Sequence, residues 1–192
     1  MNPLRLLDMP LEYAVAGWTG EYKVKGNIDQ ADCVVGLSFG YRGPLGKVSP
    51  GLSNQDLAYV AGKHYGKLPK ILQFEIADAY VESGFKNATK IIRIEKHRQK
   101  GKYLDTYEVL AQALEQMQAH GWKTALLLAH PYHMPRVQLV CDRLGLKWVA
   151  TADLEGAVEF DPLSTQKWTT GLDKWRGYEP LALTFYRLKG YA

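Results

Sequence analysis

The stretch LLLAHPYHMPRVQLV, residues 126–140, joins two different apolar patterns. Residues 126–129 form a continuous apolar run, which is typical of a strand buried on both faces of a parallel sheet. From residue 135 onward the apolar side chains recur at helical spacing. Pro135 fits best at the first helical position, because its missing N–H breaks no hydrogen bond there. The stretch therefore predicts a buried strand that turns directly into a helix, with residues 130–133 between them.

The same alternation of strand and helix runs along the rest of the chain. Apolar runs predict strands within 31–40, 70–75, 88–95, 124–129 and 146–151. Helical spacing predicts helices at 53–66, with Ser53 as its N-cap, and at 76–84, 105–121 and 135–145. This alternation predicts an α/β fold: a Rossmann-like, doubly wound, mostly parallel sheet of about five strands flanked by helices. The expected strand order is 3-2-1-4-5, as in one half of a doubly wound sheet. Residues 180–190 fit either a helix that begins at Pro180 or a strand.

The length of 192 residues fits one α/β domain over residues 1–192. Within it, residues 1–30 are interpreted as an N-terminal extension and residues 152–177 as an irregular segment. A net charge of +4 without a Lys/Arg run longer than two residues favours no nucleic-acid partner. Residues 1–17 lack the apolar core of a signal peptide, and no apolar stretch reaches the ~18 residues of a membrane span. The predicted location is the cytoplasm.

The residues that follow the predicted strands are the candidates for function, because doubly wound sheets bind ligands at the carboxyl ends of their strands. His130, Tyr132 and His133 lie in the predicted turn at residues 130–133, and Arg136 lies in the first turn of the helix. A cation at a helix N-terminus is disfavoured by the helix dipole. An anionic ligand bound at the same N-terminus would remove that penalty. Alternatively, Arg136 pairs with a carboxylate such as Asp105 or Glu108.

His133 is the candidate for a general acid or base, since the ordinary histidine pKa of about 6.5 suits proton transfer near neutrality. It could equally cap the helix or donate to an anion. Two histidines, His130 and His133, are too few for a metal centre, and no third ligand stands at a recognisable spacing. No metal is therefore expected.

Two further segments are predicted at the same edge. The loop after the first strand contains Ser38, Gly40 and Arg42, and its glycines allow a close approach of the backbone to a ligand. It matches neither a dinucleotide-binding fingerprint nor a P-loop. Glu75 and Glu95 close the second and third predicted strands. Each is a weaker candidate for a base or a ribose ligand, and an exposed charge at a strand end is the alternative.

The helix predicted at 105–121 also begins at this edge. Asp105 is expected to cap it and Glu108 to close a capping box. Together with Thr106, these two residues are candidate ligand-binding residues.

The segments DTYEV (105–109) and AHPYHMPRV (129–137) resemble the bacterial domain-of-unknown-function family 218, the YdcF/SanA/ElyC-like proteins. Tyr132, His133, Met134 and Arg136 all match its second motif, and the likeness extends over roughly residues 31–191. The resemblance implies a divergent member with a Rossmann-like fold and a pocket at the carboxyl edge. It also implies that the ligand is S-adenosylmethionine or a nucleotide-like molecule. A role in the cell envelope is associated with members that carry N-terminal membrane segments.

The sequence therefore predicts a protein that binds a small anionic molecule, nucleotide-like or phosphorylated, at the carboxyl edge of the sheet, and the resemblance implies a bacterial source. Whether it is an enzyme is left open, and the residues identify neither a reaction nor a cofactor. The alternatives are a non-catalytic ligand-binding or sensor module, and an accessory protein of cell-envelope metabolism that acts through protein partners.

Overall fold

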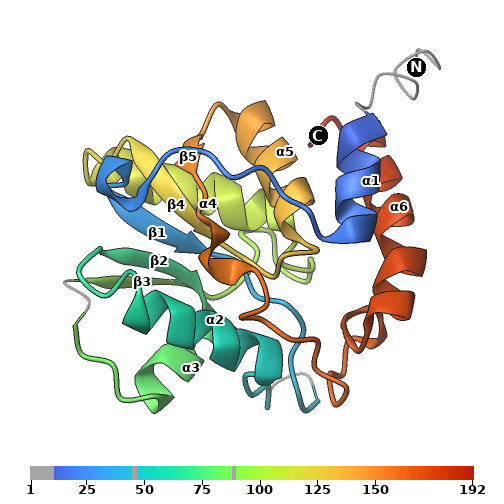
Figure 1. The fold of residues 1–192 in the computed structure, drawn as a ribbon, viewed down its shortest axis with the longest axis horizontal. Coiled ribbons are helices and arrows are strands. Elements are labelled where there is room, and N and C mark those ends of the chain that lie inside the picture. Colours follow the sequence, from blue (N-terminus) through green and yellow to red (C-terminus); the bar gives the residue numbers. More distant parts are fainter. Residues whose placement is uncertain (1–10, 45–46, 88–89) are drawn as a thin grey trace.

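The computed structural model describes residues 11–44, 47–87 and 90–192. In these ranges five strands form one sheet in which all neighbours are parallel, in the order β3-β2-β1-β4-β5 (Figure 1). The strands are β1 Cys33–Gly36, β2 Lys70–Gln73, β3 Ile91–Ile94, β4 Thr124–Leu128 and β5 Lys147–Val149. Both the Rossmann-like α/β fold and the 3-2-1-4-5 order predicted from the sequence are confirmed.

Helices connect consecutive strands and cover both faces of the sheet. They are α2 Leu52–Lys63, α3 Phe74–Glu82, α4 Thr106–Ala119 and α5 Met134–Leu144. α2 packs against α3, and α4 against α5, so each pair forms one layer. Two further helices, α1 Leu11–Thr19 and α6 Leu172–Leu188, lie side by side beyond the sheet, where the strands point (Figure 1). α6 therefore closes the carboxyl side of the molecule.

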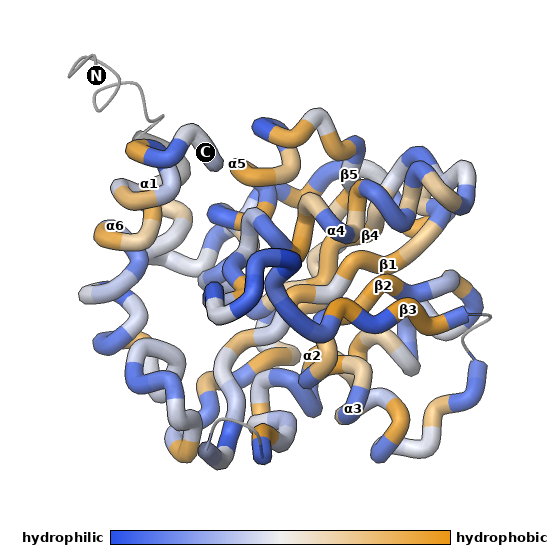
Figure 2. The backbone as a smooth tube through the Cα atoms, turned by 180° about the vertical axis from the view of Figure 1, so that it is seen from behind, coloured by the Kyte–Doolittle hydropathy of each residue, from blue (hydrophilic) through white to orange (hydrophobic). Residues whose placement is uncertain are grey.

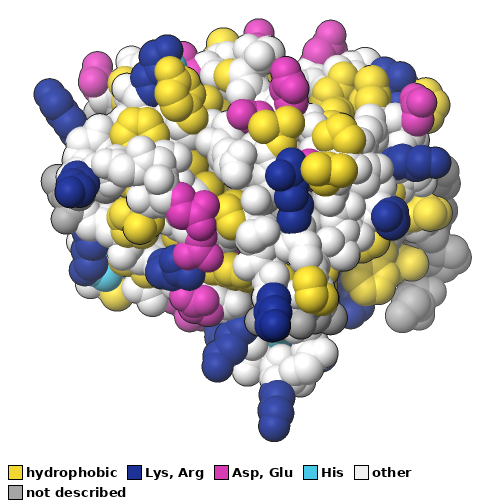
Figure 3. Space-filling model, turned by 90° about the horizontal axis from the view of Figure 1, so that it is seen from below, with side chains coloured by type: hydrophobic (Ala, Val, Ile, Leu, Met, Phe, Trp, Pro, Cys, Tyr) yellow, Lys and Arg dark blue, Asp and Glu magenta, His cyan; other side chains and the backbone are white. Residues whose placement is uncertain are grey.

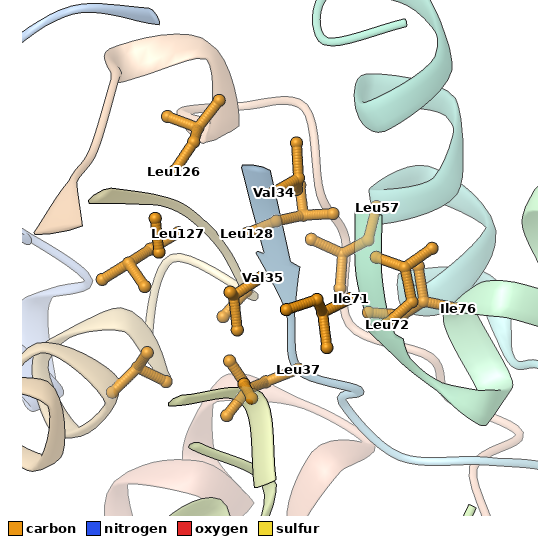
Figure 4. Packing of buried hydrophobic residues seen from close by; sticks show 14 of the residues in the cluster. Val34, Val35, Leu37, Leu57, Ile71, Leu72, Ile76, Leu126, Leu127 and Leu128 are labelled. Atoms are coloured by element: carbon orange, nitrogen blue, oxygen red, sulfur yellow. The ribbon is translucent and has the colours of Figure 1, made fainter. Parts of the chain in front are cut away.

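The central strands are apolar on both faces, as a sheet between two helical layers requires. They form the orange centre of the tube in Figure 2. Val34, Ile71 and Leu126 are fully buried. Leu57 of α2 and Ile76 of α3 pack against this cluster (Figure 4). The packing of these strands thus determines where the loops after β1 and β4 leave the sheet.

The surface has a mixed character. Lys and Arg side chains are interspersed with Asp, Glu and apolar side chains over most of the face in Figure 3. Within the described ranges, the helices are all too short or too polar to cross a bilayer.

Element boundaries differ from those predicted by a few residues, and two of these differences change the role expected of a residue. α2 begins at Leu52 after Gly51, so Ser53 is not its cap; the Ser53 hydroxyl instead donates to the Glu159 carbonyl at 2.6 Å. β2 ends at Gln73, and Glu75 lies in the first turn of α3 rather than at a strand end. The Glu75 side chain is consequently turned into the protein and is only 4% exposed.

The last helix is longer than predicted and contains Pro180 in its interior. Proline cannot donate to the carbonyl four residues earlier, that of Arg176. Trp18 of α1 fills this role, since its Nε1 donates to the Arg176 carbonyl at 3.1 Å, and Arg176 Nε donates back to the Trp18 carbonyl at 3.0 Å. The contact with α1 thus explains how a helix that contains proline extends over this segment.

The segments interpreted as an extension and as irregular contain short helical elements. Beside α1, the first contains a 3-10 turn at Ile28–Gln30. The second has 3-10 turns at Ala152–Leu154 and Lys167–Thr169 and includes the beginning of α6. Residues 1–10 lie outside the described ranges.

Asp105 caps α4 as predicted, with its carboxylate accepting from the Glu108 N–H at 2.9 Å. The Glu108 carboxylate does not return the contact but binds Arg98 Nε at 2.7 Å. We expect Asp105→Ala to lower the free energy of unfolding by about 0.5–2 kcal/mol, because it leaves a helix N–H without its acceptor. Urea unfolding measures the loss. Asp105→Asn keeps an acceptor and serves as the control; an equal loss in both variants would contradict the capping role.

Candidate functional site at the carboxyl edge

A cavity of about 600 Å³ lies between the carboxyl edge of the sheet and α6. Residues from three sequence-distant segments line it: Ser38 to Gly40 after β1, Asp105 and Thr106 at the start of α4, and His133 and Arg136 at the start of α5. Since β1 and β4 are neighbours, the cavity lies at the point where the strand order reverses. Ligands bind at this position in doubly wound sheets.

The loop after β1 contributes little free backbone to the cavity. The Ser38 N–H donates to Gln73 Oε1 at 3.1 Å, and the Phe39 N–H donates to Asn54 Oδ1 at 2.9 Å. Gly40 has a φ of 74°, and a Cβ there would collide with the Thr169 side chain. Gly40 thus allows close packing of the 164–169 segment. The two bound N–H groups are not available to cradle a phosphate.

Arg42 does not line the cavity. Its guanidinium makes two hydrogen bonds of 2.8 Å to the Asp161 carboxylate, from Nε and from Nη2. Asp161 also accepts from the Leu52 N–H at 3.2 Å. This ion pair therefore ties the glycine-rich loop to the segment before α6 and to the start of α2.

His130 and Tyr132 also lie outside the lining of the cavity. His130 is buried and stacks on Phe39 with 4.0 Å between ring centroids. Burial lowers the pKa of His130 to about 3, so its ring is neutral at pH 7. Tyr132 packs its ring closely against the backbone at Gly20. Both residues support the wall from behind.

His133 lines the cavity and is held by α4. Its Nε2 lies 3.0 Å from Thr106 Oγ1. Burial, followed by the nearby Arg136 and His130, lowers the pKa of His133 well below its ordinary value. The imidazole is therefore neutral at pH 7, and its buried Nδ1 has no hydrogen-bond partner within the described part of the protein. A neutral ring can accept or donate one hydrogen bond at that nitrogen.

Arg136 is buried, and its ion-pair partner is Glu179 of α6, 3.2 Å from Nε to Oε1. The predicted alternative, a pair with a carboxylate, is thus confirmed in kind, but the partner is neither Asp105, which caps α4, nor Glu108, which binds Arg98. The guanidinium lies 5.3–5.8 Å from the ring centroids of Trp175, Tyr178 and Tyr186.

The charges of this pair respond differently to burial. Burial disfavours the charge of Arg136, but Glu179 and the neighbouring tyrosines outweigh it, so the pKa of Arg136 is raised. Burial raises the pKa of Glu179 to about 7, although Arg136 opposes this shift. The cation is therefore permanent, whereas its counterion titrates near neutrality.

The remaining carboxylates occupy different environments. Glu95 is exposed and binds Arg93 Nε at 2.7 Å, and Glu108 binds Arg98; neither lines the cavity. Glu75 lies behind the wall and accepts a hydrogen bond of 2.7 Å from the Ser38 hydroxyl. Burial raises the pKa of Glu75 to about 7, although Ser38 opposes the shift.

Aromatic residues, most of them from the last part of the chain, form the far wall of the cavity, and sequence reasoning did not identify them. Trp168 and Tyr178 stack with 4.9 Å between ring centroids. The Tyr103 hydroxyl accepts from Gln166 Nε2 at 3.0 Å. The sequence signal that could have indicated this wall is the pair Trp168 and Trp175 in the segment 152–177, which has no regular apolar spacing. The aromatic lining residues beyond Phe39 are Tyr103, Trp168, Trp175, Tyr178, Phe185, Tyr186 and Tyr191.

Among the described residues, no three His, Cys, Asp or Glu side chains are grouped so that they could hold a metal ion. Comparison of the chain with family models finds no match. Searches of curated proteins and of solved structures find none either. The likeness to domain-of-unknown-function family 218 therefore stays an expectation drawn from the sequence.

Proposed function

We propose that this protein binds a small anionic molecule, nucleotide-like or phosphorylated, in the cavity at the carboxyl edge. The observation that carries the proposal is Arg136, a permanent cation in the wall of a cavity at the switch point of the sheet. A guanidinium offers five N–H donors, and the contact with Glu179 engages its Nε side. The Nη groups, which also have the Tyr178 hydroxyl as a neighbour, are the donors that can bind a phosphate or carboxylate.

The rest of the lining supports the same class of ligand. Lys102 and Lys189 are exposed residues of the lining, and they attract anions toward it. The aromatic wall offers flat apolar surface for a planar ring, such as a nucleobase. The resemblance to domain-of-unknown-function family 218 points in the same direction.

The proposal is tested by isothermal titration with adenosine 5′-monophosphate and with uncharged adenosine. The variant is the double replacement Arg136→Met with Glu179→Leu, which removes the cation without leaving a buried carboxylate unpaired. We expect it to weaken binding of the monophosphate at least tenfold and to leave the weaker binding of adenosine within about threefold.

A matched control removes an ion pair outside the cavity. The double variant Arg93→Met with Glu95→Leu, which removes an exposed pair, should bind the monophosphate as the wild type does. Equal loss in both double variants, or no binding of either compound by the wild type, would contradict the proposal.

A further inference from the structure

The hydroxyl of Ser38 occupies an unusual position in the wall of the cavity. Ser38 is partly exposed, whereas its neighbours Leu37 and Phe39 are buried. Its hydroxyl lies 2.7 Å from Oε2 of Glu75, which is 4% exposed and lies behind the wall. Glu75 does not itself line the cavity. Ser38 thus stands between a buried carboxyl group and the ligand space.

The direction of this hydrogen bond determines what Ser38 can offer to a ligand. Above its pKa of about 7 Glu75 is an ionised carboxylate that only accepts, so Ser38 then donates its single hydroxyl proton to Glu75. The Ser38 backbone N–H is likewise engaged by Gln73 Oε1 at 3.1 Å. What remains toward the cavity is the second lone pair of the hydroxyl oxygen. Hydrogen bonding to an anion makes that oxygen a better acceptor.

We propose that Ser38 and Glu75 form a subsite that accepts a hydrogen bond from a hydroxyl group of the bound molecule. The inference rests on the proposed function and narrows its ligand class. A ligand amine is less suitable, because its positive charge would share the cavity with Arg136, Lys102 and Lys189. The ligand class is therefore an anionic molecule that carries free hydroxyl groups, such as a sugar phosphate or a ribonucleotide.

The test compares adenosine 5′-monophosphate with 2′,3′-dideoxyadenosine 5′-monophosphate, which differ only in the two ribose hydroxyls. At pH 8, where Glu75 is largely ionised, we expect the wild type to bind the hydroxylated compound about tenfold more tightly in isothermal titration, as one satisfied hydrogen bond at a partly buried site allows. Ser38→Ala should reduce this preference to less than threefold. Ser53→Ala, which removes a buried hydroxyl bonded to the Glu159 carbonyl away from the cavity, should keep it.

Ser38→Ala leaves Glu75 without its donor and could therefore impair folding. The double variant Ser38→Ala with Glu75→Leu removes the carboxyl group as well and is titrated with the same two compounds. If the wild type binds both compounds equally, or if the serine variants keep the full preference, the subsite does not exist while the anion site stands. If the wild type binds neither compound, the proposed function fails and the subsite with it.

Discussion

Replacement of Arg136 by alanine is expected to lower the free energy of unfolding by about 3–5 kcal/mol at pH 8. Glu179 is fully buried, and at this pH, above its pKa of about 7, its carboxylate is largely ionised. Arg136 opposes the rise in the pKa of Glu179. Without Arg136 the buried carboxyl group must either stay charged without a partner or take up a proton at pH 8, and both cost stability. Guanidinium unfolding monitored by tryptophan fluorescence measures the loss.

This loss of stability is the opposite of what the sequence alone predicts. From the sequence, Arg136→Ala leaves the protein unchanged or slightly more stable, because it removes a cation from a helix N-terminus, a gain of about 0.3–1 kcal/mol. The unpaired carboxylate outweighs that gain several-fold. The effect should also depend on pH. Below pH 6 Glu179 is protonated, so the loss caused by Arg136→Ala should become smaller as the pH falls from 8 to 5.

A second variant separates the ion pair from the packing of the long arginine side chain. Arg136→Met with Glu179→Leu replaces both charges by apolar side chains of similar volume, and such exchanges are often neutral or stabilising. We expect the double variant to recover most of the loss. If it is as unstable as Arg136→Ala at every pH, the loss comes from packing against Trp175, Tyr178 and Tyr186.

The sequence was sufficient to predict the part of the site that depends on the sheet. Continuous apolar runs define the strands, their alternation with helices defines the winding, and the strand order places residues 38–40 opposite residues 130–136. These relations follow from backbone geometry and burial, which leave local patterns in the sequence. Asp105 is another local case, since a cap involves residues within one helical turn.

The partners of the charged residues could not be predicted in the same way. Glu179 reaches Arg136 only because α6 folds back over the carboxyl edge. The extent of α6 was not predicted, because Pro180 lies in its interior and proline usually stands at the start of a helix or beyond its end. The carbonyl that Pro180 leaves without a donor accepts from Trp18, a contact between the two ends of the chain. Arg42 was assigned to the ligand for a similar reason, because its partner Asp161 lies in a segment without a regular pattern.

The buried carboxyl group of Glu75 leads to a prediction about pH. Its pKa is about 7 in the folded protein and 4.5 without burial, so the folded state retains a proton that the unfolded state loses between these values. The stability that this proton contributes is present below pH 4.5 and is lost as the pH rises through 7. At about 1.4 kcal/mol per pKa unit, the loss between pH 5 and pH 8 amounts to about 2–3 kcal/mol.

Glu75→Gln removes this titration while retaining an acceptor for Ser38. The stability of the wild type relative to Glu75→Gln should therefore fall by about 2–3 kcal/mol between pH 5 and pH 8 in urea unfolding. Contributions of His130 and His133, whose lowered pKa values act in the opposite direction below pH 6.5, are common to both proteins and cancel in the difference.

Glu108→Gln is the matched control for this measurement. Burial opposes the ionisation of Glu108, but hydrogen bonds from Arg98 lower its pKa to about 2, so it stays ionised in both states from pH 5 to pH 8. The difference between wild type and Glu108→Gln should consequently be constant over this range. If the Glu75→Gln difference is equally constant, Glu75 is ionised in the folded protein throughout. The Ser38–Glu75 contact would then be an ordinary carboxylate hydrogen bond that does not change between pH 5 and pH 8.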